Sequence, residues 1–301
     1  MELKDALKEY LFECELKNYS KKTLKGYRNN NLYLFEFLLE YYQITQIEQV
    51  SLKHLKQFMQ WQMKKGRKET YLNGLNKTFR SFFKYLHEEG YIKENPTSNL
   101  NYAKEPKNVI NTFSDAEVKR MLNAFQDRDY LSMRNHAIVS ILFDTGMRTT
   151  ELCTLKNSNV RDFDILIFGK GYKERYVGKS PYLSKTLLKY ERVKAGYFEC
   201  KNVKYDNYFL SRTGRPLTVE AIENIIKIAG QRAGVSSAIR CSPHTLRHYF
   251  AQAQLRNGID VYSLSRLLGH TDIKITQRYL QGLKDEDVVE RSIKTSPLMN
   301  L

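Results

Sequence analysis

Hydrophobic residues recur at helical spacing through the first hundred residues. Apolar side chains three and four positions apart predict four amphipathic helices with short polar connections. Ser20 and Ser51 stand where the second and third helices need an N-cap, and Thr70 opens the fourth, which ends at Gly90. Helices of this kind and length bury their apolar faces against one another. The pattern therefore predicts an N-terminal four-helix domain over residues 1–103.

A change of pattern separates this region from the rest of the chain. The periodicity stops after Asn95-Pro96, and the following stretch is rich in Pro, Asn and Lys, which is typical of a linker. We place the linker at residues 104–113. Ser114 and Glu117 then form the capping-box signature that begins a helix. A second domain is therefore expected over residues 114–301.

The second domain is predicted to be mainly helical with one β-hairpin. Polar and apolar residues alternate from Val160 to Phe168 and again from Arg175 to Val177, and Gly-Lys-Gly lies between the two runs. Helical patterns are expected over 132–145, after Ser184, after Thr218, over 243–257, over 261–268, and from near 272 and near 284. The expected fold class is mainly α with a small β-hairpin.

The charge of the chain points to a polyanionic partner. Lys and Arg number 49 against 33 Asp and Glu, a formal net charge of +16. Residues 1–103 carry 17 basic and 12 acidic side chains, and the remainder carries 32 and 21. Both predicted domains are therefore basic, which suits a protein that contacts nucleic acid with each of them. Charge indicates the class of partner and leaves the chemistry open.

Other features of the composition point to the cytoplasm. The sequence contains no run of about 18 apolar residues, so no membrane span is predicted, and its beginning lacks the pattern of a secretion signal. Its cysteines are scattered and include no Cys-x-x-Cys pair, which favours free thiols over disulfides or zinc ligands; they are Cys14, Cys153, Cys200 and Cys241.

Six residues of the second domain together suit the handling of one phosphodiester. Guanidinium groups fork onto phosphate oxygens, imidazoles and an amine move protons, and a phenol can act as a nucleophile once its high pKa of about 10 is overcome. The sequence contexts are Thr-Gly-Met-Arg-Thr-Thr-Glu-Leu, Gly-Lys-Gly-Tyr-Lys-Glu-Arg, His-Thr-Leu-Arg-His, Leu-Leu-Gly-His and Gln-Arg-Tyr-Leu. The residues are Arg148, Lys170, His244, Arg247, His270 and Tyr279.

In this order the motifs resemble the catalytic boxes of the tyrosine recombinase (integrase) family. The resemblance is strong from about 114 to 290 and weaker over the four N-terminal helices, which are similar to the core-binding domain of the family. The absence of an additional N-terminal region favours a Xer-like recombinase or the integrase of a small mobile element. The expected activity is site-specific DNA cleavage and rejoining through a 3′-phosphotyrosine intermediate, with no metal, ATP or other cofactor.

The resemblance also implies a role for each motif. Arg148 and Arg247 are expected to clamp the scissile phosphate, and Tyr279 to attack it. His244 is expected to act as general acid–base near the tyrosine hydroxyl, and His270 to donate a hydrogen bond to a phosphate oxygen. From the sequence alone, Glu151, three residues after Arg148, either orients the Arg148 guanidinium or forms a simple surface pair with it.

A lysine on the hairpin turn is expected to protonate the departing 5′ oxygen. Lys170 matches the family position, and Lys173 is the alternative. The same turn lacks the glycine pattern of nucleotide-binding loops.

The sequence argues against a metal site at the paired histidines. His244 and His248 lie four residues apart, as zinc ligands do in metalloproteases, but Thr245 occupies the position of the required glutamate. We expect His248 to pack or to form a hydrogen bond within its own helix.

The expected partners are double-stranded DNA carrying specific recombination sites and further copies of the chain. The segment after Gly282 predicts a short amphipathic helix, and in the family such tails dock on a neighbouring protomer within a DNA-bound homotetramer. Accessory proteins are compatible with this scheme. Two alternatives stay open: a relaxing topoisomerase that uses the same chemistry, and a non-catalytic DNA-binding regulator on the same fold.

Overall fold

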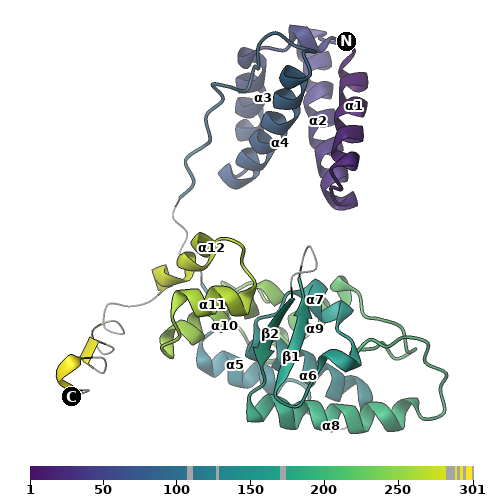
Figure 1. Ribbon diagram of the computed structural model, residues 1–301, viewed down its shortest axis with the longest axis vertical. Helices are drawn as coiled ribbons and strands as arrows, with labels where there is room; N and C mark the ends of the chain where they lie inside the picture. The colour runs from purple at the N-terminus through teal and green to yellow at the C-terminus, as the bar shows by residue number, and fades with distance from the viewer. Residues whose placement is uncertain are drawn as a thin grey trace. The chain divides into compact units, whose positions relative to one another are not determined.

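The computed structural model describes residues 1–106, 111–126, 129–169, 174–282, 289, 292–293 and 296–299. The chain divides into two compact units, Met1–Lys107 and Asn108–Leu301, which are drawn with their elements in Figure 1. Across the described ranges, every helix is too short or too polar to cross a lipid bilayer.

The first unit is a bundle of helices (Figure 1). Its elements are α1 (Leu3–Leu16), α2 (Lys21–Tyr42), the 3₁₀ turn η1 (Ile47–Gln49), α3 (Leu52–Lys64) and α4 (Glu69–Glu88). The side chain of Ser20 accepts a hydrogen bond from the backbone N–H of Thr23, as predicted for the cap of α2. Gly90 follows α4 with φ +77°, a left-handed conformation that only glycine adopts without strain.

The helices of the first unit meet in an aromatic core. On α4, Phe79, Phe82 and Phe83 recur at helical spacing, and each is fully shielded from solvent. The ring centroid of Phe82 lies 5.4 Å from that of Tyr10 on α1 and 5.9 Å from that of Phe35 on α2. Each buried aromatic side chain contributes about 1.5–3 kcal/mol through burial. The predicted apolar stripe therefore makes the contacts that hold the bundle together.

Polar side chains of α4 hold the chain that leaves the bundle. The amide of Asn73 donates to Ala103 O (2.9 Å) and to a carboxylate oxygen of Glu105 (2.6 Å), and its oxygen accepts from Ala103 N (2.8 Å). Arg80 donates to Leu100 O at 2.6 Å. The segment predicted as the beginning of the linker is thus attached to α4 as far as Glu105.

The second unit is also mostly helical. Its elements are α5 (Asp115–Leu122), α6 (Tyr130–Thr145), α7 (Thr149–Thr154), η2 (Asn157–Asn159), β1 (Asp164–Phe168), β2 (Glu174–Gly178), α8 (Pro181–Phe198), α9 (Val219–Arg232), α10 (Pro243–Arg256), α11 (Val261–Leu268), α12 (Ile273–Gln277), η3 (Arg278–Gly282) and η4 (Pro297–Met299). The predicted capping box is confirmed: Ser114 Oγ accepts from Glu117 N, and the Glu117 carboxylate accepts from Ser114 N.

A central helix organises the core of this unit. Helix α6 packs against α5, α8, α9 and α10, and Figure 1 shows α8 crossing beneath the two strands. Ala137, Ile138, Val139 and Ile141 are fully buried around its circumference, as expected for a helix that has neighbours on several sides. The mainly helical fold with a small hairpin is confirmed.

The hairpin begins later than its alternating pattern predicts. Val160 precedes the first strand, because η2 turns the chain there and Val160 N donates to Asn157 O at 3.2 Å. Strands β1 and β2 pair antiparallel, with Ile165 opposite Val177 and Ile167 opposite Arg175. Residues at alternate positions of a strand share a face, so Arg175 lies on the face that these buried apolar residues form.

The predicted start of α8 is wrong by a few residues, and that of α4 by one residue. Helix α8 is capped by Ser180, whose Oγ accepts from Leu183 N at 3.2 Å, and Pro181 fits the first turn because it needs no N–H donor there. Ser184 therefore lies inside α8. Helix α4 begins at Glu69, which places Thr70 in its first turn. The helix predicted to begin near Lys284 starts outside the described residues.

Candidate active site

A glycine turn carries the chain from α6 to the first candidate residue. Gly146 follows α6 with φ +58°, a conformation that glycine tolerates best. A Cβ atom built on Gly146 would overlap a ring carbon of Phe250, so a larger residue would also collide with α10. The turn buries Met147 and places Arg148 at the N-cap position of α7.

Arg148 is anchored to Glu151 through both its backbone and its side chain. Arg148 N donates to Glu151 Oε2 at 2.7 Å, and Arg148 Nη1 donates to Glu151 Oε1 at 3.0 Å. The Arg148 side chain remains 41% exposed, whereas that of Glu151 is 5% exposed. Burial raises the pKa of Glu151, but Arg175 and Arg148 outweigh this effect and hold the pKa below its ordinary value. The predicted orienting role of Glu151 agrees with this geometry.

Arg247 is a buried cation on α10. Its Nη1 donates to Gly146 O at 2.7 Å and its Nη2 donates to Leu268 O at 2.6 Å, while the residue is 3% exposed. Burial, and then the positive charge of Arg148, lower the pKa of Arg247 to about 10, so it stays charged at neutral pH. These hydrogen bonds to carbonyl oxygens fix the guanidinium between α6, α10 and α11.

The C-terminal end of α11 brings three arginines together. Three successive carbonyl oxygens accept from them: Leu267 O from Arg175, Leu268 O from Arg247 and Arg148, and Gly269 O from Arg148. Unsatisfied carbonyls at a helix end carry partial negative charge, which favours cations. Gly269 ends α11 with φ +65°, in the left-handed conformation of a helix cap. Arg148 and Arg247, far apart in sequence, are thus held at one helix end.

His270 follows that helix end and uses both ring nitrogens. Its Nε2 lies 3.0 Å from Arg247 Nη2, and its Nδ1 lies 2.8 Å from Thr276 Oγ1. Because a guanidinium only donates, Nε2 must accept, and Nδ1–H then donates to the threonine. Burial, and then Arg247 and Arg148, lower the pKa of His270 to about 4. His270 adjoins Arg247, and a phosphate-donor role requires its Nε2 to gain a proton.

Tyr279 lies in η3, which directly follows α12, and its side chain turns inward. The residue is 4% exposed and packs with the buried residues Phe250, Leu255 and Leu264. Its hydroxyl lies 3.0 Å from His248 Nδ1. Burial raises the pKa of Tyr279, and the positive charges of Arg247, Arg278 and Arg148 oppose the rise.

His248 packs against the rings of His244 and Tyr279, as one of the two expectations had it, but its hydrogen-bond partner lies outside its own helix. Burial, followed by the positive charge of neighbours, lowers the pKa of His248 to about 4, so its neutral ring can accept from the Tyr279 hydroxyl. His244, one turn earlier on α10, is exposed, and its ring centroid lies 4.1 Å from that of His248. Desolvation, and then Arg247, Arg278 and Arg148, lower the pKa of His244. In this arrangement the phenol contacts the second histidine.

Lys170 and its alternative Lys173 lie outside the described residues. The sequence motifs gave no role to Arg175, whose side chain forms an ion pair with Glu151. A sequence signal for this residue existed: in the alternating hairpin pattern, Arg175 occupies the same face as Ile165 and Ile167. An arginine on an apolar face needs a buried partner, and that requirement points to an internal ion pair.

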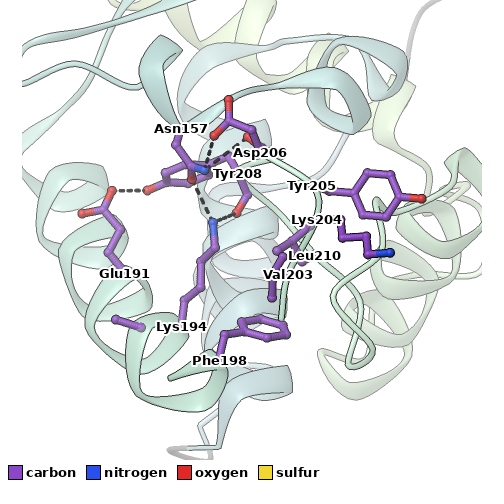
Figure 2. A pocket seen from close by; sticks show the side chains of 11 residues that line it. Asn157, Glu191, Lys194, Phe198, Val203, Lys204, Tyr205, Asp206, Tyr208 and Leu210 are labelled. Atoms are coloured by element: carbon purple, nitrogen blue, oxygen red, sulfur yellow. Dashed lines mark hydrogen bonds between the residues drawn. The ribbon is translucent and has the colours of Figure 1, made fainter. Parts of the chain in front are cut away.

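Two pockets of the second unit, one beside Lys194 and one beside His136, lie away from these residues. Figure 2 shows one of about 610 Å³ beside α8, where Lys194 donates to Tyr208 O at 2.7 Å and Tyr208 donates to Glu191 at 2.6 Å. The side chains of Lys194, Tyr208 and Glu191 in its wall are therefore engaged in hydrogen bonds within the protein. In the described part of the chain, no cluster of three or more His, Cys, Asp or Glu is arranged to hold a metal ion.

The chain matches known families over both units. Residues 111–286 match the phage integrase family, and residues 5–90 match the N-terminal SAM-like domain of phage integrases. A tyrosine recombinase XerC from Bacillus pumilus is 32% identical over 275 residues, which cover 89% of this chain and 88% of that protein.

Solved structures are similar to this fold. The Tn1549 transposon integrase in complex with transposon right end DNA matches with a TM-score of 0.77 at 17% identity, covering 98% of this chain and 99% of that one. The XerH site-specific recombinase bound to a palindromic difH substrate matches with a TM-score of 0.76 at 19% identity, covering 92% and 81%.

Proposed function

The chain belongs to the phage integrase family of tyrosine recombinases, and we propose that it cleaves and rejoins double-stranded DNA at specific sites. Tyr279 Oη attacks the scissile phosphorus, and the bond from phosphorus to the 5′ oxygen breaks. The products are a 3′-phosphotyrosine and a free 5′ hydroxyl. A 5′ hydroxyl of another strand then reverses the step. The ester bond is exchanged rather than hydrolysed, so the reaction needs no external energy source.

One observation carries this proposal: Arg148, Arg247 and His270 surround the end of α11, with Tyr279 within electrostatic range of both guanidiniums. Negative charge develops on the non-bridging oxygens during attack. Fixed cations stabilise that charge without reorganisation at the moment of reaction. Arg148 is exposed enough to bind a phosphate, and Arg247 supplies a second, buried charge behind it.

We assign the proton transfers to residues on two elements. His244 acts as general acid–base for the tyrosine hydroxyl, because it is exposed and adjoins the arginines that would bind the phosphate. Lys170 protonates the departing 5′ oxygen, with Lys173 as the alternative. His270 donates to a phosphate oxygen once its Nε2 is protonated.

The buried position of Tyr279 implies a conformational step before attack. A side chain that is 4% exposed offers no room for a DNA phosphate beside its hydroxyl. We propose that the hydroxyl leaves His248 when DNA binds, through a movement of the short segment η3. The 3₁₀ geometry of η3 suits such a change, because 3₁₀ turns have weaker hydrogen bonds than α-helices.

The complete reaction requires two DNA sites and several protomers. We propose a homotetramer on paired duplexes, in which the segment after Gly282 contacts a neighbouring protomer. Xer-like resolution and the integration or excision of a mobile element both use this assembly, and accessory proteins would set the direction. Both parts of the chain are basic, so phosphate contacts supply much of the DNA affinity. The expected compartment is the cytoplasm.

The proposal is tested with DNA sites selected by binding to the purified protein. A selected duplex with a nick close to the cleavage position traps the covalent intermediate, because the short cleaved fragment diffuses away. The wild-type chain should form a denaturant-resistant protein–DNA band, and peptide mapping should locate the adduct at Tyr279. Tyr279→Phe should bind the duplex with unchanged affinity and form no band.

Three outcomes separate the alternatives. A band that persists in Tyr279→Phe would assign the nucleophile elsewhere. Binding without any band in the wild-type chain would support the non-catalytic regulator. Relaxation of a supercoiled plasmid, without strand exchange between paired selected sites, would support the topoisomerase.

A further inference from the structure

Arg175 is a charged side chain on the buried face of the hairpin. The pairing of β1 with β2 places it beside Ile165, Ile167 and Val177, whose exposed fractions are 0%, 2% and 3%. The Arg175 side chain itself is 9% exposed. A cation in such a position is costly unless it is paired and fully hydrogen-bonded.

The guanidinium of Arg175 is satisfied by two partners. Its Nη1 and Nη2 donate to Glu151 Oε1 at 2.9 Å and Oε2 at 2.6 Å, in the forked geometry that arginine and carboxylate favour. Its Nε donates to Leu267 O at 2.8 Å. A Cβ atom on Gly269 would lie 3.1 Å from Arg175 Cδ, so the turn after α11 also packs closely on this side chain.

Glu151 is therefore shared between two arginines with different surroundings. Arg175 occupies both of its carboxylate oxygens, and Arg148 adds a backbone and a side-chain donor. The charge of Glu151 is balanced by buried Arg175, so the exposed guanidinium of Arg148 keeps positive charge for a ligand. Without Arg175, the carboxylate would have Arg148 as its main cationic partner.

We propose that Arg175 is a positioning residue for the DNA-cleavage step. It fixes Glu151 and the carbonyl end of α11 together, and these two groups orient Arg148 and Arg247. The inference rests on the proposed function, since positioning matters only if the two arginines bind the scissile phosphate. It also connects strand β2 to the arginines, through a side chain that has no contact with the substrate.

The variants for the test are Arg175→Met, Arg175→Lys and the double variant Arg175→Met/Glu151→Gln, all in the full chain. Arg161→Met is the matched control, because it removes one positive charge near the same hairpin, where Arg161 lies exposed over the ring of Tyr176. Single-turnover cleavage of the nicked duplex is measured between about pH 5.5 and 8.5, alongside DNA binding. Thermal unfolding without DNA is measured over the same pH range.

Arg175→Met should slow cleavage by roughly 10²-fold, the loss expected when catalytic groups shift by about 1 Å. Its rate should also fall further as the pH decreases, because a buried carboxyl that loses its main cationic partner has a higher pKa. The double variant should lack this pH-dependent loss. Arg175→Lys should recover part of the rate, because a lysine restores the charge without the fork. Arg161→Met should resemble the wild-type chain.

The results separate the inference from the proposed function. An Arg175→Met variant with the wild-type pH profile for both cleavage and unfolding would overturn the positioning role. A change in unfolding alone, with unchanged cleavage at a temperature where the variant is folded, would reduce Arg175 to a structural residue. If the wild-type chain forms no adduct, the proposed function fails, whereas the unfolding series still reports whether Arg175 controls the ionisation of Glu151.

Discussion

The hydroxyl of Tyr279 lies 3.0 Å from Nδ1 of His248 and is almost completely shielded from solvent. The pKa of His248, lowered to about 4, keeps the ring neutral at physiological pH, so the ring nitrogen accepts and the phenol donates. The proposed nucleophile is thus held in its neutral, unreactive form. The contact also gives the two histidines of α10 distinct roles that mutagenesis can separate.

His244→Ala should reduce the cleavage rate by roughly 10²–10⁴-fold, the usual range for loss of a general acid–base. His248→Ala should reduce it less than about tenfold, because removal of a docking contact leaves the proton transfer intact. Single-turnover cleavage of the nicked duplex measures both effects. A larger loss of cleavage rate in His248→Ala than in His244→Ala would assign the acid–base role to His248.

Arg148→Ala should reduce cleavage by about 10²–10³-fold, since one fixed charge at the reacting phosphate is lost. DNA binding should be nearly unchanged, because many other basic residues contact the backbone in the proposed complex. The Arg148 side chain is 41% exposed, so the variant should also unfold at nearly the wild-type urea concentration.

Arg247→Ala should show a similar loss of cleavage together with lower stability. The substitution removes the donors to Gly146 O and Leu268 O in a buried region, and an unpaired buried polar group costs about 1–3 kcal/mol. Urea unfolding of the two arginine variants in parallel measures this difference. Equal stability of both variants would contradict the buried anchoring described for Arg247.

Gly146→Ala should destabilise the protein more than Gly234→Ala. Both glycines have φ +58°, so both substitutions carry the same left-handed strain of about 1–2 kcal/mol. A Cβ atom on Gly146 would also overlap Phe250, whereas one on Gly234 has no described neighbour within 4 Å. Such overlap typically adds about 1–3 kcal/mol. Urea unfolding of the two variants measures the difference between their free energies of unfolding, which is the contribution of the overlap with Phe250. Equal decreases in the free energy of unfolding would exclude that contribution.

Stability should decrease as the pH falls from about 7 to about 4. The pKa values of His248 and His270 are lowered to about 4 in the folded chain, against about 6.5 in the unfolded chain. Between these values the unfolded state binds more protons, so the free energy of unfolding rises with pH and levels off above the unfolded pKa. Both rings are partly exposed, which limits the effect to roughly 1 kcal/mol each.

Urea unfolding of the wild-type chain and of His270→Asn, measured at pH 5 and pH 7.5, checks this expectation. The variant should have the smaller change in unfolding free energy between the two conditions. An identical change would mean that His270 titrates normally in the folded protein.

The sequence predicted the fold well where local patterns decide it. Ser20 and Ser114 were recognised as caps because their side chains satisfy backbone N–H groups only a few residues away. Ser184 was misassigned because a serine also occurs at position 180, directly before a proline. The start of β1 was missed because a side-chain cap at η2, invisible to the alternation of Val160 to Phe168, turns the chain first.

The sequence motifs named Arg148, Arg247 and His270, which meet at the end of α11. The hydrogen bonds that these and neighbouring residues form depend on contacts between distant parts of the sequence. The contact of His248 with Tyr279 depends on where η3 packs against α10, which no local pattern encodes. The link from Arg175 to Glu151 joins residues 24 positions apart. Roles on the hairpin turn stay predictions, because Lys170 and Lys173 lie outside the described residues.

The hydrogen bond between Asn73 and Glu105 reduces the number of residues that connect the two units without being held by the first unit. Among the described residues, the next side-chain hydrogen bond along the chain is that of Thr112, whose Oγ1 lies 2.8 Å from Gln252 Oε1. Fully extended chain from Glu105 to Thr112 spans at most roughly 25 Å, at about 3.3–3.6 Å per residue. Once one unit has bound DNA, so short a tether keeps the other at an effective concentration on the order of millimolar. Even weak contacts by each unit can therefore add up to long residence on a duplex.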